Sequence, residues 1–419
     1  MPVIKPIISG ASVKNATVVP IVAEEDLLIG DNVALFYKPN EYYEVPFEDI
    51  GASEYSRCAF SPDNSLLALY YYTAGVTWPV IYDVVKQEVL PIPETVLSSN
   101  DYVSNCVFSP DGKQFAVSCS SELAVYIYDA TTRPFKLLAK LSCFSKAYLI
   151  YNHASTRLCV ISSSNTSITS TLWGIYDTKT FSKLTNPTGF TGSDVFIRSV
   201  VYSPDDKQLA IIYESTVSSA EHTFVGIFDN RGLTPTQVAA YDSYSTSILD
   251  VPVYSPDGRQ LYVYWHDWYI FDVTPSSITE CSVSTGTNST GGVISGGTLR
   301  HFCSAEPMMI WAGSDDYNGD STEDIAVHSI NISGNFVYEY ASKIIASGSS
   351  AGEYSLSISM DGTQFFLNYT VGDTHYMRVY EMGWFAKKAN YITQQFAQGV
   401  GYSANNIKAG QVGTATRII

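Results

Sequence analysis

The sequence has little positive charge. Its 419 residues include 24 Lys and Arg against 41 Asp and Glu, so the formal net charge is −17. A protein that binds nucleic acid or anionic lipid by charge needs a basic surface, and the longest basic run here is Lys387-Lys388. The balance therefore predicts a chain that binds no nucleic acid.

Long apolar runs are also missing. No segment approaches the roughly 20 apolar residues of a membrane-spanning helix. The N-terminal segment MPVIKPIISGASVKN lacks the continuous apolar stretch of a signal peptide. These absences predict no membrane insertion and synthesis in the cytoplasm.

Catalytic motifs are the third absence. The chain contains no H-E-x-x-H, G-x-S-x-G, phosphate-binding loop or Cys-x-x-Cys pair. The histidines do not cluster, and an isolated histidine in a strand is usually a hydrogen-bonded structural residue. They are His153, His222, His266, His301, His328 and His375. We therefore predict no catalytic residues and no enzymatic activity.

Seven cysteines make an odd count. Five of them fall in apolar, strand-like segments: Cys58, Cys106, Cys119, Cys159 and Cys303. Cysteine behaves as a small apolar residue when it is unpaired. We therefore expect free, buried thiols and assembly in a reducing compartment.

The residues that are present favour strands. Hydrophobic residues make up 45% of the chain and charged residues only 16%, and there are 31 tyrosines. Ser, Thr, Val and Ile are common, and β-branched and aromatic residues suit a pleated, half-buried surface. The composition predicts an all-β chain with a large core.

A short peptide recurs along the middle of the chain. It reads FSPD at Phe60–Asp63, FSPDG at Phe108–Gly112, YSPDD at Tyr202–Asp206 and YSPDG at Tyr254–Gly258, with a degenerate ISMDG at Ile358–Gly362. Intervals of 48 and 52 residues between neighbouring copies predict two hidden copies, at Tyr151–Ala154 and Phe302–Ala305. A second signature, IYD or a variant of it, follows each copy: Ile81–Asp83, Ile127–Asp129, Ile175–Asp177, Ile227–Asp229, Ile270–Asp272, Val327–Ser329 and Val379–Glu381.

Each repeat reads as four antiparallel strands. In the second copy we predict strands at Ser104–Phe108, Lys113–Val117, Ala124–Tyr128 and Phe135–Leu138. Ser-Pro-Asp-Gly forms a turn between the first two, because Pro presets φ and Gly tolerates positive φ. The aspartates that close the second signature are predicted to cap turns: Asp83, Asp129, Asp177, Asp229 and Asp272. Seven such repeats predict a seven-bladed β-propeller.

These turns resemble those of WD-repeat-like β-propellers, particularly bacterial and viral members with FSPDG turns. The resemblance covers roughly residues 51–385 and implies the fold. The Trp-Asp dipeptide and the Gly-His pair of true WD repeats are missing. The buried Asp–His network of those repeats is therefore not expected.

The two ends lie outside the repeats. Asp26–Tyr37 and Gly399–Ile419 are similar to the two halves of a small β-module of bacteriophage virion proteins, I-x-x-G-D-x-V-x-L early and I-x-A-G-x-x-G late. The resemblance implies that the propeller is inserted into this module, which is feasible where termini lie close together. We predict three segments: 1–50 (first half of the β-module and a ring-closing strand), 51–385 (propeller) and 386–419 (second half of the module). The alternative is an ordinary hairpin at each end.

One loop carries a metal-ligand pattern. The segment DYNGDSTEDIAV, Asp316–Val327, resembles the calcium loop of FG-GAP-type repeats. The resemblance implies Ca²⁺ ligands at Asp316, Asn318, Asp320 and Asp324, and closely spaced oxygens suit this hard cation. Ser321 replaces the usual Gly. The alternative is a polar hairpin loop without a metal.

An aromatic cluster allows two interpretations. It consists of Tyr262, Tyr264, Trp265, Trp268, Tyr269 and Phe271. The rings could stack on sugars, but their alternation fits two sides of a strand pair more simply. We therefore predict mainly core residues here.

The resemblance to the virion module implies a function. It indicates a bacteriophage virion structural protein, made in the bacterial cytoplasm, whose propeller serves host receptor contact or decoration as a tail fibre, a tail-associated protein or a head decoration. The implied partners are other virion proteins, further copies in a homo-oligomer, and a host surface glycan or protein. The alternatives are an intracellular WD-repeat-type interaction scaffold and a propeller glycan hydrolase or lyase.

Overall fold

The computed structural model of the chain is built from strands. It describes residues 16–23, 28, 32–45, 55–71, 79–90 (without 85 and 87), 103–143 (without 121), 147–162, 174–243, 252–281 (without 256, 257 and 266), 284–285, 298–303, 308–315, 323–333, 336–348, 355–359, 364–371, 374–388, 399–403 and 412–418. These ranges contain no helix, so the described chain is all-β, as predicted. Within them, accordingly, no helix has the length and apolar character needed to span a bilayer.

One compact unit combines both ends of the chain. It comprises residues 1–43 and 381–419 and is called the terminal unit below. Its strands lie in the order β1 (Ala16–Ala23), β31 (Val412–Ile418), β30 (Gly399–Ser403) and β2 (Asn32–Val45). These neighbours are antiparallel, with Val19 opposite Ala415 and Val33 opposite Gly401. The first and last strands of the chain therefore share one sheet.

A second compact unit, residues 44–380, is called the central unit. Its first sheet contains β3 (Tyr55–Phe60), β4 (Leu66–Tyr71), β5 (Val80–Asp83) and β6 (Glu88–Val89). The second contains β7 (Val103–Phe108), β8 (Gln114–Cys119), β9 (Ala124–Asp129) and β10 (Lys136–Ser142). The third contains β11 (Ala147–Tyr151), β12 (Arg157–Ser162) and β13 (Gly174–Asp177). Strands β7 to β10 coincide with the four predicted for this copy, although β10 extends further, to Ser142.

The remaining sheets continue this succession. The fourth sheet contains β14 (Ser193–Tyr202), β15 (Gln208–Val217), β16 (Ala220–Asp229) and β17 (Thr236–Asp242), and the next contains β18 (Val253–Tyr254), β19 (Gln260–Trp265), β20 (Asp267–Thr274) and β21 (Ser277–Cys281). A further sheet contains β22 (Ser284–Thr285), β23 (Thr298–Cys303), β24 (Met308–Asp315), β25 (Glu323–Ser333) and β26 (Phe336–Gly348). The last strands of the central unit are β27 (Ser355–Ile358), β28 (Gln364–Val371) and the first part of β29 (Thr374–Lys388). Apart from β22, which runs parallel to β26, paired strands within these sheets are antiparallel.

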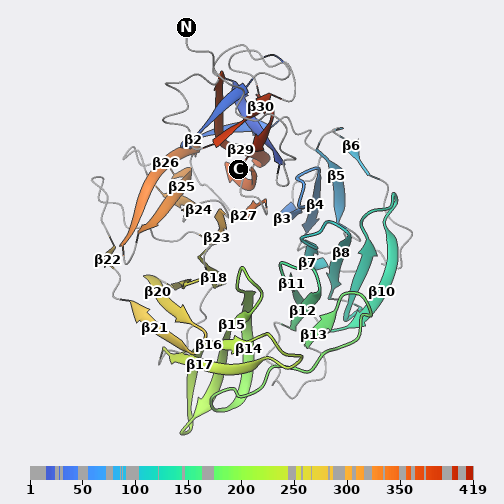
Figure 1. Cartoon of the computed structure of the whole chain (residues 1–419), viewed down its shortest axis with the longest axis vertical. Helices are drawn as coiled ribbons and strands as arrows, with labels where there is room; N and C mark the ends of the chain where they lie inside the picture. The colour runs from blue at the N-terminus through green and yellow to red at the C-terminus, as the bar shows by residue number, and fades with distance from the viewer. Residues whose placement is uncertain are drawn as a thin grey trace. The chain divides into compact units, whose positions relative to one another are not determined.

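Successive sheets of the central unit contact one another, as Figure 1 lets the reader follow from β3 to β27. Strand β4 contacts β7, β7 contacts β11, β12 contacts β14, β14 contacts β18, β18 contacts β23 and β23 contacts β27. Strand β27 in turn contacts β3. The sheets therefore form a closed succession, in which the last sheet meets the first.

The core lies between the sheets because alternate residues of one strand face opposite neighbours. In β4, Leu66 and Ala68 pack with the sheet of β7 to β10, around Phe108. Leu67 and Leu69 of the same strand pack on the other side, in a cluster with Cys58, Phe60, Tyr82, Phe366, Met377 and Val379. The second cluster joins the first sheet to strands β28 and β29, so the closure of the succession is apolar.

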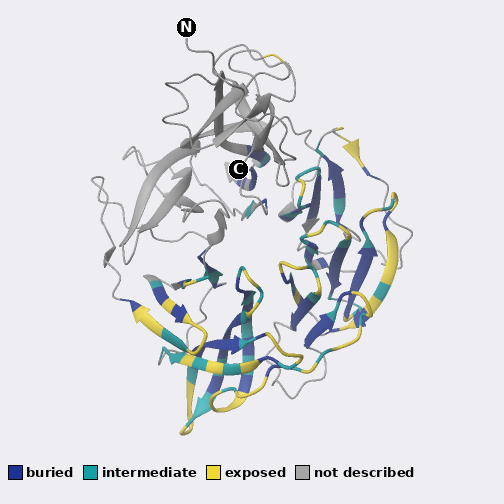
Figure 2. Ribbon diagram, viewed as in Figure 1, coloured by how far each residue is buried: buried dark blue, intermediate teal, exposed yellow. Residues whose placement is uncertain are grey.

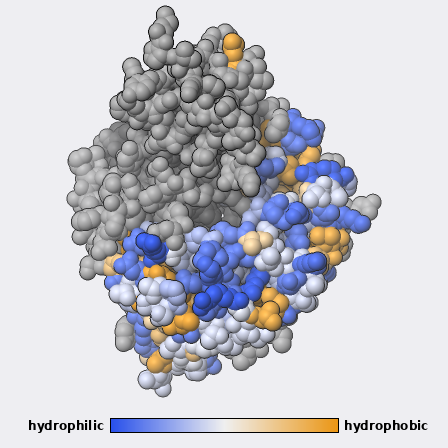
Figure 3. All heavy atoms as spheres, viewed as in Figure 1, coloured by the Kyte–Doolittle hydropathy of each residue, from blue (hydrophilic) through white to orange (hydrophobic). Residues whose placement is uncertain are grey.

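Burial falls from the inner strands of a sheet to its outermost strand, as Figure 2 shows. Strand β9 is buried over five consecutive residues, whereas most of β10 is exposed or partly exposed. A strand with both faces covered reads as a continuous apolar run, and this explains the sequence AVYIY at 124–128. Figure 3 shows apolar residues as separate spots on the described part of the visible face, which is otherwise largely polar.

Six cysteines have described side chains, and all six are free and buried: Cys58, Cys106, Cys119, Cys143, Cys159 and Cys281. This confirms the prediction for Cys58, Cys106, Cys119 and Cys159. Burial raises the pKa of Cys143 and of Cys159 to about 12. Because the thiolate is the reactive form, these thiols are packing residues.

Gly192, which precedes β14, gives a test of the fold. Its φ is +86°, and a Cβ atom there would lie 2.8 Å from the backbone oxygen of Thr216. We expect Gly192→Ala to lower the free energy of unfolding by at least about 1 kcal/mol, since the left-handed conformation alone costs about that much. Gly232→Ala is the matched control, because its Cβ would meet nothing closer than 3.7 Å. Urea unfolding of both variants measures the difference, and equal stabilities would contradict the packing of this turn.

Candidate functional site

The recurring turns join the first two strands of each repeat by one hydrogen-bond pattern. The first turn residue donates its N–H to the carbonyl five residues on, as Ser109 does to Gln114 (2.9 Å). The same pair occurs at Ser61, Asn152, Ser203, Ser255 and Ser359. The copy predicted at Tyr151–Ala154 is therefore confirmed as a turn of this type. In the copy predicted at Ile358–Gly362 the Ser359–Gln364 bond has the same spacing, but residues 360–362 lie outside the described residues. The copy predicted at Phe302–Ala305 lies partly outside the described residues.

Side chains reinforce each turn. The Ser109 Oγ accepts the N–H of Gln114 (2.9 Å) and donates to Asp111 Oδ1 (2.7 Å). Serine hydroxyls at 61, 203, 255 and 359 accept in the same way, and Asn152 Oδ1 does so from Arg157 N (2.7 Å). The fourth turn position has positive φ in five copies: Asn64, Gly112, Ser155, Asp206 and Gly258. Gly, Asn and Asp tolerate this conformation best, which accounts for four of these five residues; Ser155 is the exception.

The aspartates of the second signature cap the next turn in four described repeats. Backbone N–H groups two or three residues on donate to the carboxylates of Asp83, Asp129, Asp177 and Asp229 at 2.7–3.0 Å. The bonds from Arg231 lower the pKa of Asp229 to about 2. The prediction is wrong for Asp272, which lies two residues before the end of β20 and accepts from Gln260 Nε2 (3.1 Å).

Neighbouring turns are hydrogen-bonded to one another. Asp206 accepts from His153 N (2.9 Å), His153 Nδ1 (3.0 Å), Ala154 N (2.7 Å) and Asn152 Nδ2 (2.9 Å). Ser155 Oγ accepts the N–H of Asp111 (2.9 Å) from the turn on the other side. The turns at 109–114, 152–157 and 203–208 are thus joined by hydrogen bonds. Together with the equivalent turns at 61–66 and 255–260 they are called the turn face below.

The last residue of each turn connects its sheet to the next one. We call it the clasp position: Leu66, Gln114, Arg157, Gln208 and Gln260. At three junctions its side chain donates to a carbonyl of the following sheet: Gln114 Nε2 to Thr178 O (2.8 Å), Arg157 Nη1 to Asn230 O (3.1 Å) and Gln208 Nε2 to Thr274 O (2.9 Å). Sequence reasoning missed these residues, although aligned turns show the Gln.

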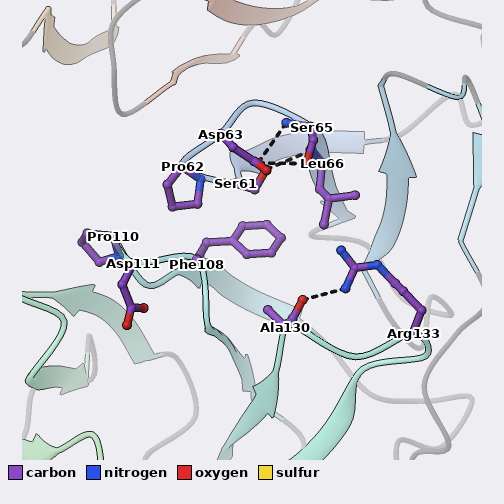
Figure 4. A pocket seen from close by; sticks show the side chains of 11 residues that line it. Ser61, Pro62, Asp63, Ser65, Leu66, Phe108, Pro110, Asp111, Ala130 and Arg133 are labelled. Carbon is purple, nitrogen blue, oxygen red and sulfur yellow. Dashed lines mark hydrogen bonds between the residues drawn. The ribbon is translucent and has the colours of Figure 1, made fainter. Parts of the chain in front are cut away.

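The junction between the first and second sheets lacks this clasp. Leu66 occupies the clasp position, and the equivalent carbonyl, Ala130 O, accepts instead from Arg133 Nη1 (2.6 Å) of its own loop. A cavity of about 350 Å³ opens here, as Figure 4 shows. Its lining includes Leu66, Phe108, Asp63 and Arg133. This cavity is the candidate functional site of the turn face.

Comparison with known proteins establishes the fold. No family model matches the sequence, and no curated protein matches it either. The β-propeller domain of Cps50 (Swd1) from Myceliophteria thermophila aligns over 81% of this chain and 99% of its own, with a TM-score of 0.53 and 11% sequence identity. The chain has a β-propeller fold. Hydrazine synthase from Kuenenia stuttgartiensis aligns over 80% of this chain and 98% of its own, at a TM-score of 0.49 and 14% identity.

The predicted calcium ligands are not tested by the propeller structure. Asp316, Asn318 and Asp320 lie outside the described residues, and Asp324 lies in β25, opposite Asp315 of β24. Among the described residues, no group of three potential metal ligands of the His, Cys, Asp or Glu type comes together.

Other predicted residues are placed by the structure. His153 and His222 bond to Asp206 and Asp242 (2.9 Å for the His222 pair), so both are hydrogen-bonded structural residues as predicted. Tyr262 and Phe271 of the aromatic cluster are buried, and Tyr269 is partly buried. The core interpretation therefore holds for Tyr262 and Phe271.

Asp206 tests the linkage of the turns. Asp206→Asn keeps the shape and the left-handed preference, but it replaces an acceptor oxygen by a donor amide. We expect a loss of about 1–3 kcal/mol in the free energy of unfolding, measured by urea denaturation near pH 7. Asp205→Asn, at the neighbouring and more exposed carboxylate that bonds to Lys207, is the control and should change little.

The same variant predicts a pH dependence. Burial raises the pKa of Asp206, but the bonds from His153 and Ala154 outweigh it, so the net pKa lies below the ordinary value. A carboxyl group with a lowered folded-state pKa stabilises the protein above its unfolded pKa, and this stabilisation is lost as pH falls through the folded pKa. The stability gap between wild type and Asp206→Asn should therefore narrow below about pH 4. A gap that stays constant down to pH 2 would contradict the role of the charge.

The calcium prediction has a direct test. If Ca²⁺ binds only the folded chain, it adds RT ln(1 + [L]/Kd), about 2.7 kcal/mol at 100 times Kd. We expect EGTA to lower the midpoint of thermal unfolding of the wild type and of Asp205→Asn, but not of Asp320→Ala. A wild-type midpoint that ignores both EGTA and Ca²⁺ would show that the loop is a turn only.

Proposed function

We propose that this protein is a structural component of a bacteriophage particle, without enzymatic activity. In this proposal a seven-bladed propeller is displayed for host contact or decoration, and the unit made of the two chain ends attaches it to the particle. We assign the seventh blade in this proposal to β27, β28 and the first part of β29, because these strands follow six preceding sheets of the central unit.

The observation that carries the proposal is the pairing of the chain ends. The segments that resemble the virion module contain β2, β30 and β31. Strand β31 lies between β1 and β30, and β30 lies beside β2. Two halves separated by more than 300 residues in sequence thus form one sheet, which is the arrangement that an inserted propeller requires.

The charge of the chain bears on which partners the proposal allows. A net charge of −17 keeps copies soluble and disfavours nucleic acid. The terminal unit comprises 43 and 39 residues, and a unit of that size buries only a modest apolar core on its own. We therefore propose that it gains stability from other virion proteins or from further copies of this chain.

Two other roles use the same fold. A β-propeller also suits an intracellular protein-interaction scaffold or a glycan hydrolase, and the fold alone does not separate them. No observation on the central unit favours either role over the virion role. The experiment below therefore includes results that would point to another role.

The test is incorporation into particles. Deleting residues 412–419 removes β31, the strand that joins β1 to β30. We expect the variant to retain the β-rich circular dichroism spectrum of the propeller and to be absent from purified phage particles by mass spectrometry. Gly232→Ala, which should fold normally, is the control and should be incorporated at wild-type copy number.

Two results would contradict the proposal. One is a truncated chain that copurifies with particles at the normal level. The other is a full-length chain that is absent from particles of the phage that encodes it, which would favour the scaffold role.

A further inference from the structure

At the first junction of the turn face the clasp position holds an apolar residue, Leu66, where the other four turns have Gln or Arg. Three junctions are closed by a polar side chain that reaches the next sheet. At the junction of the second and third sheets, Tyr151 also donates to Gln114 Oε1 (3.2 Å). At the first junction, Leu66 and Phe108 stand in place of Gln114 and Tyr151, and neither can make these bonds. The cavity of about 350 Å³ lies at this junction.

Arg133 presents an unused edge at this cavity. Its bonds to Ala130 O (2.6 Å) and Thr132 O (2.9 Å) both start from Nη1. The guanidinium carbon lies 4.8 Å from the centre of the Phe135 ring, which supports it by a cation–π contact. The Nε and Nη2 atoms of this arginine can therefore donate to a ligand. The planar guanidinium pairs well with a carboxylate, which accepts two parallel hydrogen bonds.

Asp63 presents an unused acceptor. The Ser61 hydroxyl (2.6 Å), the Ser65 hydroxyl (2.8 Å) and the Ser65 N–H (3.1 Å) all donate to its Oδ1. Burial raises the pKa of Asp63, but these bonds outweigh it, so the carboxylate is ionised at neutral pH. Its Oδ2 is left to accept from a ligand hydroxyl.

Asp111 at the rim differs from Asp63. Its Oδ1 accepts from Ser109 Oγ and its Oδ2 from Lys113 Nζ (3.0 Å), so both oxygens and the charge have partners. The acceptor and the cation that remain open are therefore Asp63 and Arg133. Figure 4 shows them on different sides of Leu66, with the Phe108 ring between the two turns.

We propose that this cavity binds an acidic sugar residue, a pyranose that carries a carboxylate. The carboxylate pairs with Arg133 and a ring hydroxyl donates to Asp63. The apolar face of the ring lies against Pro62 and Pro110, the partly exposed apolar residues of the lining. The volume is at the lower end of that of small-ligand sites, which suits one sugar residue. The inference deepens the proposed host contact by naming the glycan class.

The same groups argue against a basic or neutral ligand. A cationic group would face Arg133, and a neutral sugar would leave the open edge of that guanidinium without a partner. An acidic peptide side chain could reach Arg133, but it carries no hydroxyl for Asp63. An acidic sugar uses both groups.

Binding of glucuronate to the full-length protein tests the proposal. We expect a dissociation constant in the millimolar range by isothermal titration calorimetry or saturation-transfer NMR, with glucose and acetate at least 10-fold weaker. Arg133→Gln, at an exposed residue, should weaken glucuronate at least 10-fold. Arg231→Gln is the matched control, because Arg231 lies in the equivalent loop of a later repeat and pairs with Asp229; it should leave binding unchanged.

Leu66→Gln gives an independent arm. It introduces the Gln found at this position in three other turns, which should reach across the cavity to Ala130 O and abolish binding, while the protein stays folded by circular dichroism. The proposal is overturned if the wild-type protein shows no binding at a 50-fold molar excess of glucuronate. It is also overturned if glucuronate still binds to both the Arg133→Gln and the Leu66→Gln variants.

Two further outcomes decide the ligand class and the link to function. If acetate binds as tightly as glucuronate, the sugar assignment is wrong. If N-acetyl-aspartate amide binds as tightly as glucuronate, the ligand is an acidic peptide and not a sugar. The virion role is tested separately by incorporation. A protein that enters particles but does not bind glucuronate refutes this inference alone, and one that binds but does not enter particles refutes the virion role alone.

Discussion

The central unit depends on one constraint: the inner strands of the sheets whose side chains are described bury residues on both faces. Leu66 and Leu67 are neighbours in β4, yet they belong to two different cores, one on each side of the sheet. A sheet of this kind is not stable alone, because one apolar face would remain in water. Each sheet therefore needs a neighbour on both sides. The requirement ends only when the last sheet meets the first, as it does where Cys58 packs near Phe366 and Val379.

The turn chemistry serves this constraint by fixing register. A slip of one residue in β8 would move Phe115 and Val117 from one core to the other and reverse both faces. The bond from Gln114 N to Ser109 Oγ, with a left-handed residue at Gly112, permits one register only. Asp206 then links the turn of one sheet to that of the sheet before it. Packing holds the sheets together, and the turns determine which residues face which core.

The sequence made the repeated parts of the fold predictable and left the contacts between repeats hidden. Spacing alone located the turn at Tyr151–Ala154, although Asn152 replaces Ser, because an Asn side chain offers the same acceptor oxygen. Asp83 and Asp129 were recognisable as caps since they end their strands, whereas Asp272 has the same signature inside a longer strand and caps nothing. The role of Asp206 was not visible, because its partners lie 52 to 54 residues away. The clasp residues recur in the aligned turns, but their targets are backbone carbonyls, which carry no sequence signature.

The candidate site follows from the clasp position that holds an apolar residue, Leu66, where the other turns of the turn face have Gln or Arg. Exchanging a clasp Gln for Leu loses a hydrogen bond of about 0.5–1.5 kcal/mol, but a fully buried Leu contributes about 1.5–3 kcal/mol. Leu66 is 4% exposed and belongs to the core around Phe108. The carbonyl that would otherwise lack a partner, Ala130 O, is satisfied by Arg133. The first junction thus keeps its stability while it leaves a cavity, and the residue that replaces the clasp bond, Arg133, lines that cavity. In this fold a cavity can therefore form where one repeat departs from the others at a position that packing can compensate.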